Sequence, residues 1–125
     1  MVQYTGYLLH GERIRSVDMR FCRHLYCSES LKKRKRKIIW KIKHNAGQIS
    51  VYVITISDRA DEQLEIFHSG QLLQRYYKIY PPCIVGIADG YGEAIELIKC
   101  IAQEVYQKTG GLDIKRYLKD REGRL

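Results

Sequence analysis

The fold is decided by one continuous stretch, residues 83–109, which reads CIVGIADGYGEAIELIKCIAQEVYQKT. Its first six residues are almost wholly apolar, as in a buried strand. Asp89-Gly90-Tyr91-Gly92 then predicts a turn into a helix that ends at Thr109-Gly110-Gly111. The apolar residues of this helix recur at steps of three and four and form one stripe: Tyr91, Ala94, Ile95, Ile98, Ile101, Ala102 and Val105.

Two further strands are expected upstream of this stretch. Residues 48–56 are rich in β-branched and aromatic side chains, and both faces are apolar, which favours a central position in a sheet. Residues 64–67 follow after a short polar turn and therefore predict an antiparallel neighbour.

Two shorter helices complete the C-terminal part. Ser69 is expected to cap a helix that Pro81-Pro82 terminates and that carries Leu72, Leu73, Tyr76, Tyr77 and Tyr80. Asp113 is expected to cap a last helix with Ile114, Tyr117 and Leu118 on one face. This order of elements predicts a crossover connection and a single α/β (α+β) domain, in which helices pack on a small mixed sheet of three to four strands.

The N-terminal third gives weaker signals. Residues 2–9 suggest a strand, and Ser16 suggests the cap of a short helix with Val17, Phe21 and Leu25 on one side. Residues 31–43 favour a helix with Leu31, Lys35, Ile38, Ile39 and Ile42 on one face, which would end at residues 45–47 with Gly47 in the left-handed conformation. The alternation of Ile38, Trp40 and Ile42 leaves a hairpin strand open as the alternative.

The length of 125 residues suits one domain, residues 1–125, and its charge is divided unevenly. The net charge is +8, yet residues 1–47 hold 12 Lys+Arg against 3 Asp+Glu, which gives +9. Residues 48–125 hold 10 against 11, which gives −1. The chain therefore combines a basic N-terminal part with a near-neutral core, a pattern that points to a polyanionic partner.

The cations are densest between residues 32 and 43, where no acid separates them. Such a run cannot be buried, and its like-charge repulsion costs local stability, so we expect it to bind nucleic acid or another polyanion without sequence specificity. Trp40 would add a stacking surface for bases. The candidate nucleic-acid-binding residues are Lys32, Lys33, Arg34, Lys35, Arg36, Lys37, Lys41, Lys43, Arg20, Arg23 and Trp40.

The spacing Gly86-x-x-x-Gly90-x-Gly92 resembles the cofactor loop of short-chain dehydrogenases, which would imply an anion at Gly90 and Gly92 beside a helix N-terminus. The 33 residues after Gly92 supply neither a further strand with an acidic ribose partner nor the Tyr-x-x-x-Lys pair of that family. A tight strand-to-helix turn is therefore the favoured interpretation, and nucleotide or phosphate binding here is the alternative.

No cofactor, metal site or catalytic constellation is expected. Cys22, His24 and Cys27, with His10 upstream, lack the second ligand pair of a structural zinc site. No apolar stretch approaches the roughly twenty residues of a membrane span, and no secretory signal precedes the domain, so a cytoplasmic, non-catalytic accessory protein is expected. A protein-interaction module or homodimer is the main alternative, because tyrosine is enriched at interfaces; its candidates are Tyr76, Tyr77, Tyr80 and Tyr106.

Overall fold

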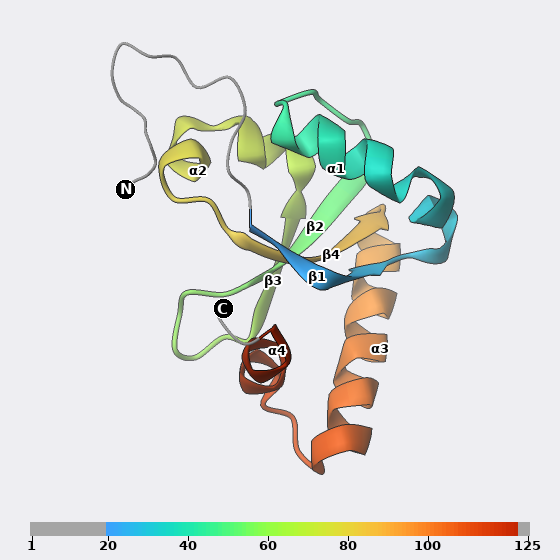
Figure 1. Ribbon diagram of the computed structural model, residues 1–125, viewed down its shortest axis with the longest axis vertical. Helices are drawn as coiled ribbons and strands as arrows, with labels where there is room; N and C mark the ends of the chain where they lie inside the picture. Colours follow the sequence, from blue (N-terminus) through green and yellow to red (C-terminus); the bar gives the residue numbers. More distant parts are fainter. Residues whose placement is uncertain (1–19, 123–125) are drawn as a thin grey trace.

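The computed structural model describes residues 20–122, which form one mixed sheet with helices on both of its faces (Figure 1). The elements in chain order are β1 (Arg20–Cys27), the 3₁₀ helix η1 (Glu29–Arg34), α1 (Lys35–Lys43), β2 (Val51–Ile56), β3 (Leu64–His68), the 3₁₀ helix η2 (Ser69–Leu73), α2 (Arg75–Ile79), β4 (Cys83–Asp89), α3 (Tyr91–Thr109) and α4 (Ile114–Glu122). None of the helices in this range combines the length and apolarity that a membrane crossing requires.

The four strands lie in the order β1-β4-β2-β3. β2 runs antiparallel to both of its neighbours, with Ile54 opposite Ile66 of β3 and Val53 opposite Ile87 of β4. β1 pairs in parallel with β4 at the other edge. The predicted central position of residues 48–56 and the antiparallel strand after it are thus confirmed.

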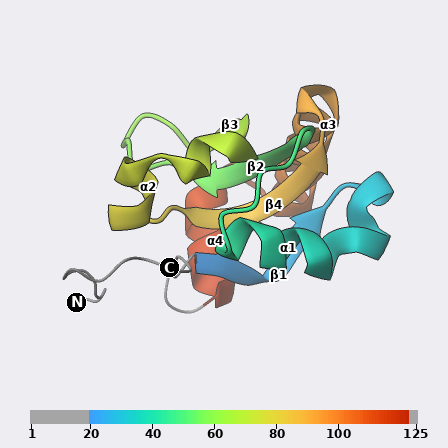
Figure 2. The same ribbon diagram turned by 90° about the horizontal axis from the view of Figure 1, so that it is seen from above.

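The sheet separates two apolar cores (Figure 2). On one face, Leu31 of η1, Ile38 and Ile42 of α1 and Leu72 of η2 pack on the strands. On the other face, the buried side chains of α3 and α4, among them Ile101 and Leu118, pack on the opposite sides of the same strands. This arrangement confirms the predicted α+β domain with a small mixed sheet.

The strand-to-helix turn after β4 needs glycine at one position. Gly90 has φ of +92°, a conformation that side chains rarely adopt, and it directly precedes α3. Gly86 is closely packed, because a Cβ there would lie 3.3 Å from side-chain carbons of both Ile54 and Leu97, which would have to shift slightly. α3 then runs as predicted to the left-handed Gly110, although Tyr91 is 56% exposed and not part of its buried stripe.

Residues 31–43 are helical, so the hairpin alternative is wrong. η1 leads directly into α1, and the predicted inward face is confirmed with Leu31, Ile38 and Ile42 buried. The turn that follows differs from the prediction, because Asn45 and not Gly47 takes the left-handed conformation, with φ of +59°. Asparagine tolerates this region better than most residues.

Two other sequence predictions are wrong. The helix expected to carry Phe21 and Leu25 is in fact strand β1. Pairing with the distant strand β4 outweighs the local spacing of four between these residues. Val17 and the expected strand at residues 2–9 lie outside the described residues. The expected single helix after β3 is broken at Gln74 into η2 and α2. Its cap is the His68 ring, which accepts the Gly70 N–H at 2.9 Å, whereas Ser69 is buried.

Candidate nucleic-acid interface

The basic segment, defined as residues 32–43, spans η1 and α1 on one outer face of the domain (Figure 1). Its apolar residues hold the segment on the sheet, since Ile38 and Ile42 are at most 4% exposed. All of its cations are exposed or half-exposed. Those on η1 are Lys32, Lys33 and Arg34, and those on α1 are Lys35, Arg36, Lys37, Lys41 and Lys43.

The outward face of α1 is centred on Trp40, which is 58% exposed. Successive helix residues are about 100° apart, so Arg36 and Lys43 flank Trp40 on one side and Lys37 and Lys41 on the other. The Trp40 ring stacks on the His44 ring, with centroids 4.1 Å apart and planes 18° apart. The helix therefore presents a flat aromatic surface between two rows of cations.

The charges of the basic segment have almost no partners within residues 20–122. One ion pair occurs there, between Lys32 Nζ and the exposed carboxylate of Glu29 at 3.1 Å. α1 has no acidic residue in its first turn, and Lys35, Arg36 and Lys37 lie at its N-terminal end, where the helix dipole disfavours cations. Lys43 makes one further contact, its Nζ lying 5.7 Å from the centre of the Phe21 ring.

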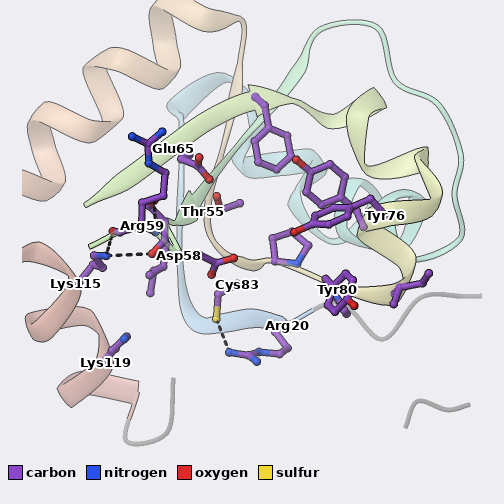
Figure 3. A pocket seen from close by; sticks show the side chains of 17 residues that line it. Arg20, Thr55, Asp58, Arg59, Glu65, Tyr76, Tyr80, Cys83, Lys115 and Lys119 are labelled. Atoms are coloured by element: carbon purple, nitrogen blue, oxygen red, sulfur yellow. Dashed lines mark hydrogen bonds between the residues drawn. The ribbon is translucent and has the colours of Figure 1, made fainter. Parts of the chain in front are cut away.

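The structure does not bring Arg20 and Arg23 to this face. Arg20 donates to the Cys83 thiol at 3.2 Å and lines a pocket at one end of the sheet, to which Lys119 of α4 also contributes (Figure 3). Arg23 reaches the buried carboxylate of Glu122 in α4, with Nε 3.8 Å from Oε1. Proximity in sequence placed both arginines in the predicted site, but only the pairing of β1 decides where they point.

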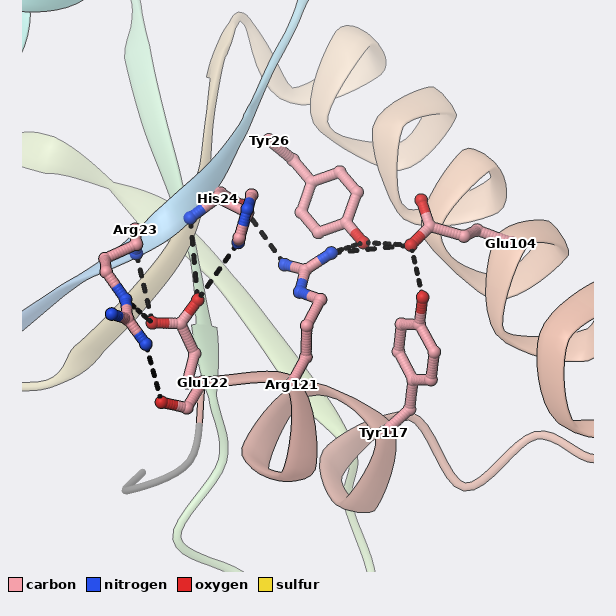
Figure 4. Close-up of polar contacts among 7 residues, drawn as sticks. All are labelled: Arg23, His24, Tyr26, Glu104, Tyr117, Arg121 and Glu122. Atoms are coloured by element: carbon pink, nitrogen blue, oxygen red, sulfur yellow. Dashed lines mark hydrogen bonds and ion pairs between the residues drawn. The ribbon is translucent and has the colours of Figure 1, made fainter.

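Glu122 fastens α4 to the outer edge of β1 (Figure 4). Its carboxylate accepts the backbone N–H of Arg23 at 3.1 Å and that of His24 at 3.5 Å. Burial by itself raises the pKa of Glu122, but these two hydrogen bonds and the charges of Arg23 and Arg121 outweigh it and lower the pKa below its ordinary value. The carboxylate of Glu122 is therefore ionised, and its role is to hold α4 against β1.

A second carboxylate joins α3 to α4 and β1 (Figure 4). Glu104 accepts the hydroxyls of Tyr117 at 2.7 Å and Tyr26 at 2.9 Å and lies 3.4 Å from Arg121. Burial opposes ionisation of Glu104, yet the two hydroxyls and the guanidinium lower its pKa overall. Burial and the hydrogen bond to Glu104 raise the pKa of Tyr26 to about 12, so its hydroxyl remains a donor.

The remaining candidate residues lie in three separate places. Cys22 packs in the core beneath α3 and α4, whereas Cys27 packs on the core beneath α1. Across residues 20–122, no three His, Cys, Asp or Glu side chains converge in a way that could hold a metal ion. At the start of α3, Glu93 occupies the first turn and accepts the Ser30 hydroxyl at 2.9 Å beside Gly90 and Gly92.

The structure adds one residue to the predicted site, His44, whose ring stacks on the ring of Trp40. The sequence signal that could have found it is the spacing of four between two aromatic rings on one helix. No protein-family model, curated protein or solved structure matches this chain, so the interpretation of the surface rests on its own geometry.

Proposed function

We propose that the protein binds nucleic acid through the outward face of the basic segment, largely without sequence preference and without catalysis. One observation carries this proposal: Trp40 and His44 form an exposed stack between cations that have a single ion-pair partner within residues 20–122. Lysine and arginine neutralise phosphates and release counterions, while an exposed ring stacks on unpaired bases regardless of their identity.

An anionic membrane surface would also attract these cations, but the helix geometry favours nucleic acid. A helix that binds a bilayer surface buries an apolar face among the lipid tails. The apolar face of α1 is already covered by the sheet, because Ile38 and Ile42 are 2% and 4% exposed. What remains toward solvent is cationic and aromatic.

Trp40 is the one tryptophan of the chain, so its fluorescence reports directly on this face. We expect short single-stranded DNA or RNA to quench it and to bind with an affinity that falls steeply between about 50 and 200 mM salt. Trp40→Ala should weaken binding more than Trp40→Phe, which keeps an aromatic ring.

A matched pair of triple variants tests the cations. Changing Lys33, Arg36 and Lys37 to Gln should reduce the slope of log affinity against log salt by about 2, at roughly 0.7 per lost phosphate contact with a single strand. Changing the exposed Lys99, Lys108 and Arg116 to Gln alters the net charge equally but away from this face. Equal slopes for the two variants, measured by fluorescence anisotropy, would refute the assignment.

Self-association is a second candidate function, because the backbone groups at the two edges of the sheet differ in whether they have hydrogen-bond partners within residues 20–122. β1 has a register irregularity between Phe21 and Tyr26, and Glu122 accepts two of its backbone N–H groups. β3 pairs with β2 on one side, and no other segment within residues 20–122 bonds to its backbone. An uncovered edge strand is a template for another strand.

The occupant that fits β3 is a second copy of β3 in antiparallel register about Ile66. That register places Ile66 opposite itself and Glu65 opposite Phe67, so no like charges face each other. In a Cys100→Ser background, Ile66→Cys should form a disulfide-linked dimer on mild oxidation, and the exposed control Leu73→Cys should not. A monomer by light scattering across concentration would exclude this candidate.

A further inference from the structure

A concave surface lies at one end of the sheet, and Trp40 is not among the residues that line it (Figure 3). It has a volume of about 790 Å³, within the range of small-molecule pockets. Its walls come from the ends of β1, β2, β3 and β4, from α2 and from α4. We refer to it as the strand-end pocket. Aromatic rings line one of its sides, and charged side chains lie at its two ends.

Four consecutive rings line one side of the strand-end pocket. Phe67 stacks on Tyr77 at a centroid distance of 5.3 Å, Tyr77 meets Tyr76 edge-on at 5.1 Å, and Tyr76 lies 5.1 Å from Tyr80. The inner pair is half-buried, but Tyr76 and Tyr80 are 56% and 63% exposed. The outer rings therefore offer free π-faces at the border of a cavity, where a planar group can stack.

The charged side chains of the strand-end pocket separate into two ends. Arg20 lies at one end and Arg59 and Glu65 lie at the other, while Lys119 lines the side formed by α4, next to Lys115 (Figure 3). The contact of Arg20 with the Cys83 thiol uses one of the five guanidinium N–H donors. An anion is thus favoured at the Arg20 end.

The Glu65 end suits hydrogen-bond donors, because the side chain of Glu65 lines the pocket and carboxylate oxygens accept hydrogen bonds (Figure 3). Burial raises the pKa of Glu65 first, and the neighbouring carboxylates of Glu62 and Asp58 raise it further. Asp58 also lines the pocket, and its charge disfavours an anion near this end. Lys115 is not available to a ligand, because its ammonium donates to the carbonyls of Ser57 at 3.1 Å and Arg59 at 2.7 Å.

We propose that the strand-end pocket binds one nucleotide unit, with its planar base on Tyr76 and Tyr80 and its phosphate between Arg20 and Lys119. Donor groups of the base or sugar then face Glu65. A free mononucleotide and the unpaired terminal nucleotide of a strand share this chemistry. The proposal does not depend on binding at the basic segment, because Trp40 does not line this pocket.

The test is calorimetric titration of the full chain with each 5′-mononucleotide, with the corresponding nucleoside and with inorganic phosphate. We expect at least one mononucleotide to bind more tightly than its nucleoside or phosphate alone. Competition between a mononucleotide and oligonucleotides with or without a 5′-phosphate separates the free ligand from the strand terminus. Absence of binding by all mononucleotides and all terminal phosphates overturns the proposal.

Matched variants localise the site. Tyr80→Ala and Lys119→Gln should each weaken binding about fivefold or more, whereas Tyr106→Ala and Lys108→Gln on α3 should not. Both pocket side chains are exposed, so thermal melting should show these variants folded. Equal loss in the α3 controls overturns the assignment.

The Trp40 signal separates the two sites. Mononucleotides should leave Trp40 fluorescence unchanged while heat is released. Strands that quench Trp40 when no mononucleotide or 5′-phosphorylated terminus binds support the basic segment alone and contradict the pocket. Mononucleotide binding without quenching by any strand supports the pocket and contradicts the interface on α1.

Discussion

α1 and α4 are both nine residues long and both pack on the same sheet, yet they use their charges in opposite ways. α1 carries five cations and no acid, and its outward face is left to solvent. α4 carries four cations and two acids, and three of these six charges are bonded to other elements: Glu122 to β1, Arg121 to Glu104, and Lys115 to carbonyls after β2. The contrast supports the proposal that a polyanion binds on α1, because the cations of α1 have fewer partners within residues 20–122 than those of α4.

The buried apolar residues of the two helices should contribute similar amounts to the free energy of unfolding. Removing them should have the largest effects on stability. Ile38→Ala in α1 and Leu118→Ala in α4 each create a cavity at a site that is at most 2% exposed. We expect each to lower the free energy of unfolding by about 2–5 kcal/mol. Urea denaturation measures both. A loss well below 1 kcal/mol for Ile38→Ala would show that α1 is not held by its core face.

The charge contrast predicts a smaller effect that is specific to α4. Glu122→Gln removes a buried carboxylate that accepts the N–H groups of Arg23 and His24, and should cost about 1–3 kcal/mol. The control on the same helix is Asp120→Asn, because Asp120 is exposed and lies 3.9 Å from Arg116. We expect less than about 0.5 kcal/mol there. Equal costs for the two variants would remove the distinction between structural and surface charges.

The same carboxylates predict how stability depends on pH. The pKa values of Glu104 and Glu122 are lowered in the folded state from an ordinary value of 4.5. Their contribution is therefore complete above pH 4.5 and is lost as the pH falls below it toward the lowered values. The double variant Glu104→Gln/Glu122→Gln should lose stability less steeply over this interval in thermal melts. An unchanged pH profile would contradict the network in Figure 4.

The smallest expected effect is a gain in stability in the basic segment. Lys37→Glu places an acid in the first turn of α1 and four residues before Lys41, which should raise stability by about 0.3–1 kcal/mol. The same change should weaken nucleic-acid binding. Lys108→Glu, in the last turn of α3, makes the same charge change against the helix dipole and should lower stability. If Lys37→Glu instead destabilises the protein, the cations of α1 have partners that the geometry does not reveal.

Much of the fold was predictable because its signals are local. β2, β4 and α3 have continuous apolar runs or stripes, and Gly90 and Gly110 punctuate them at the positions where a positive φ is required. β1 was not predictable. It is an edge strand with a register irregularity, and it is held by a parallel partner about sixty residues away. The spacing of four between Phe21 and Leu25 predicts a helix, because the local sequence does not reveal the pairing with β4.

The candidate sites divide in the same way. The cation run of α1 is visible in the sequence, and its Trp40–His44 stack follows once the segment is known to be helical. The strand-end pocket was not predictable, because Arg20, Tyr80 and Lys119 come from three separate elements. Nor does the sequence tell that Arg23 is paired with Glu122, ninety-nine positions later.

The sequence by itself determined where positive charge accumulates and which segments must bury one face, since both depend on neighbours a few residues apart. Tertiary structure alone decided which cations keep their charge free for a partner and which surround a cavity. Ion pairing and concavity require side chains that meet across the sheet, and the pairing of β1 with β4 brings them together.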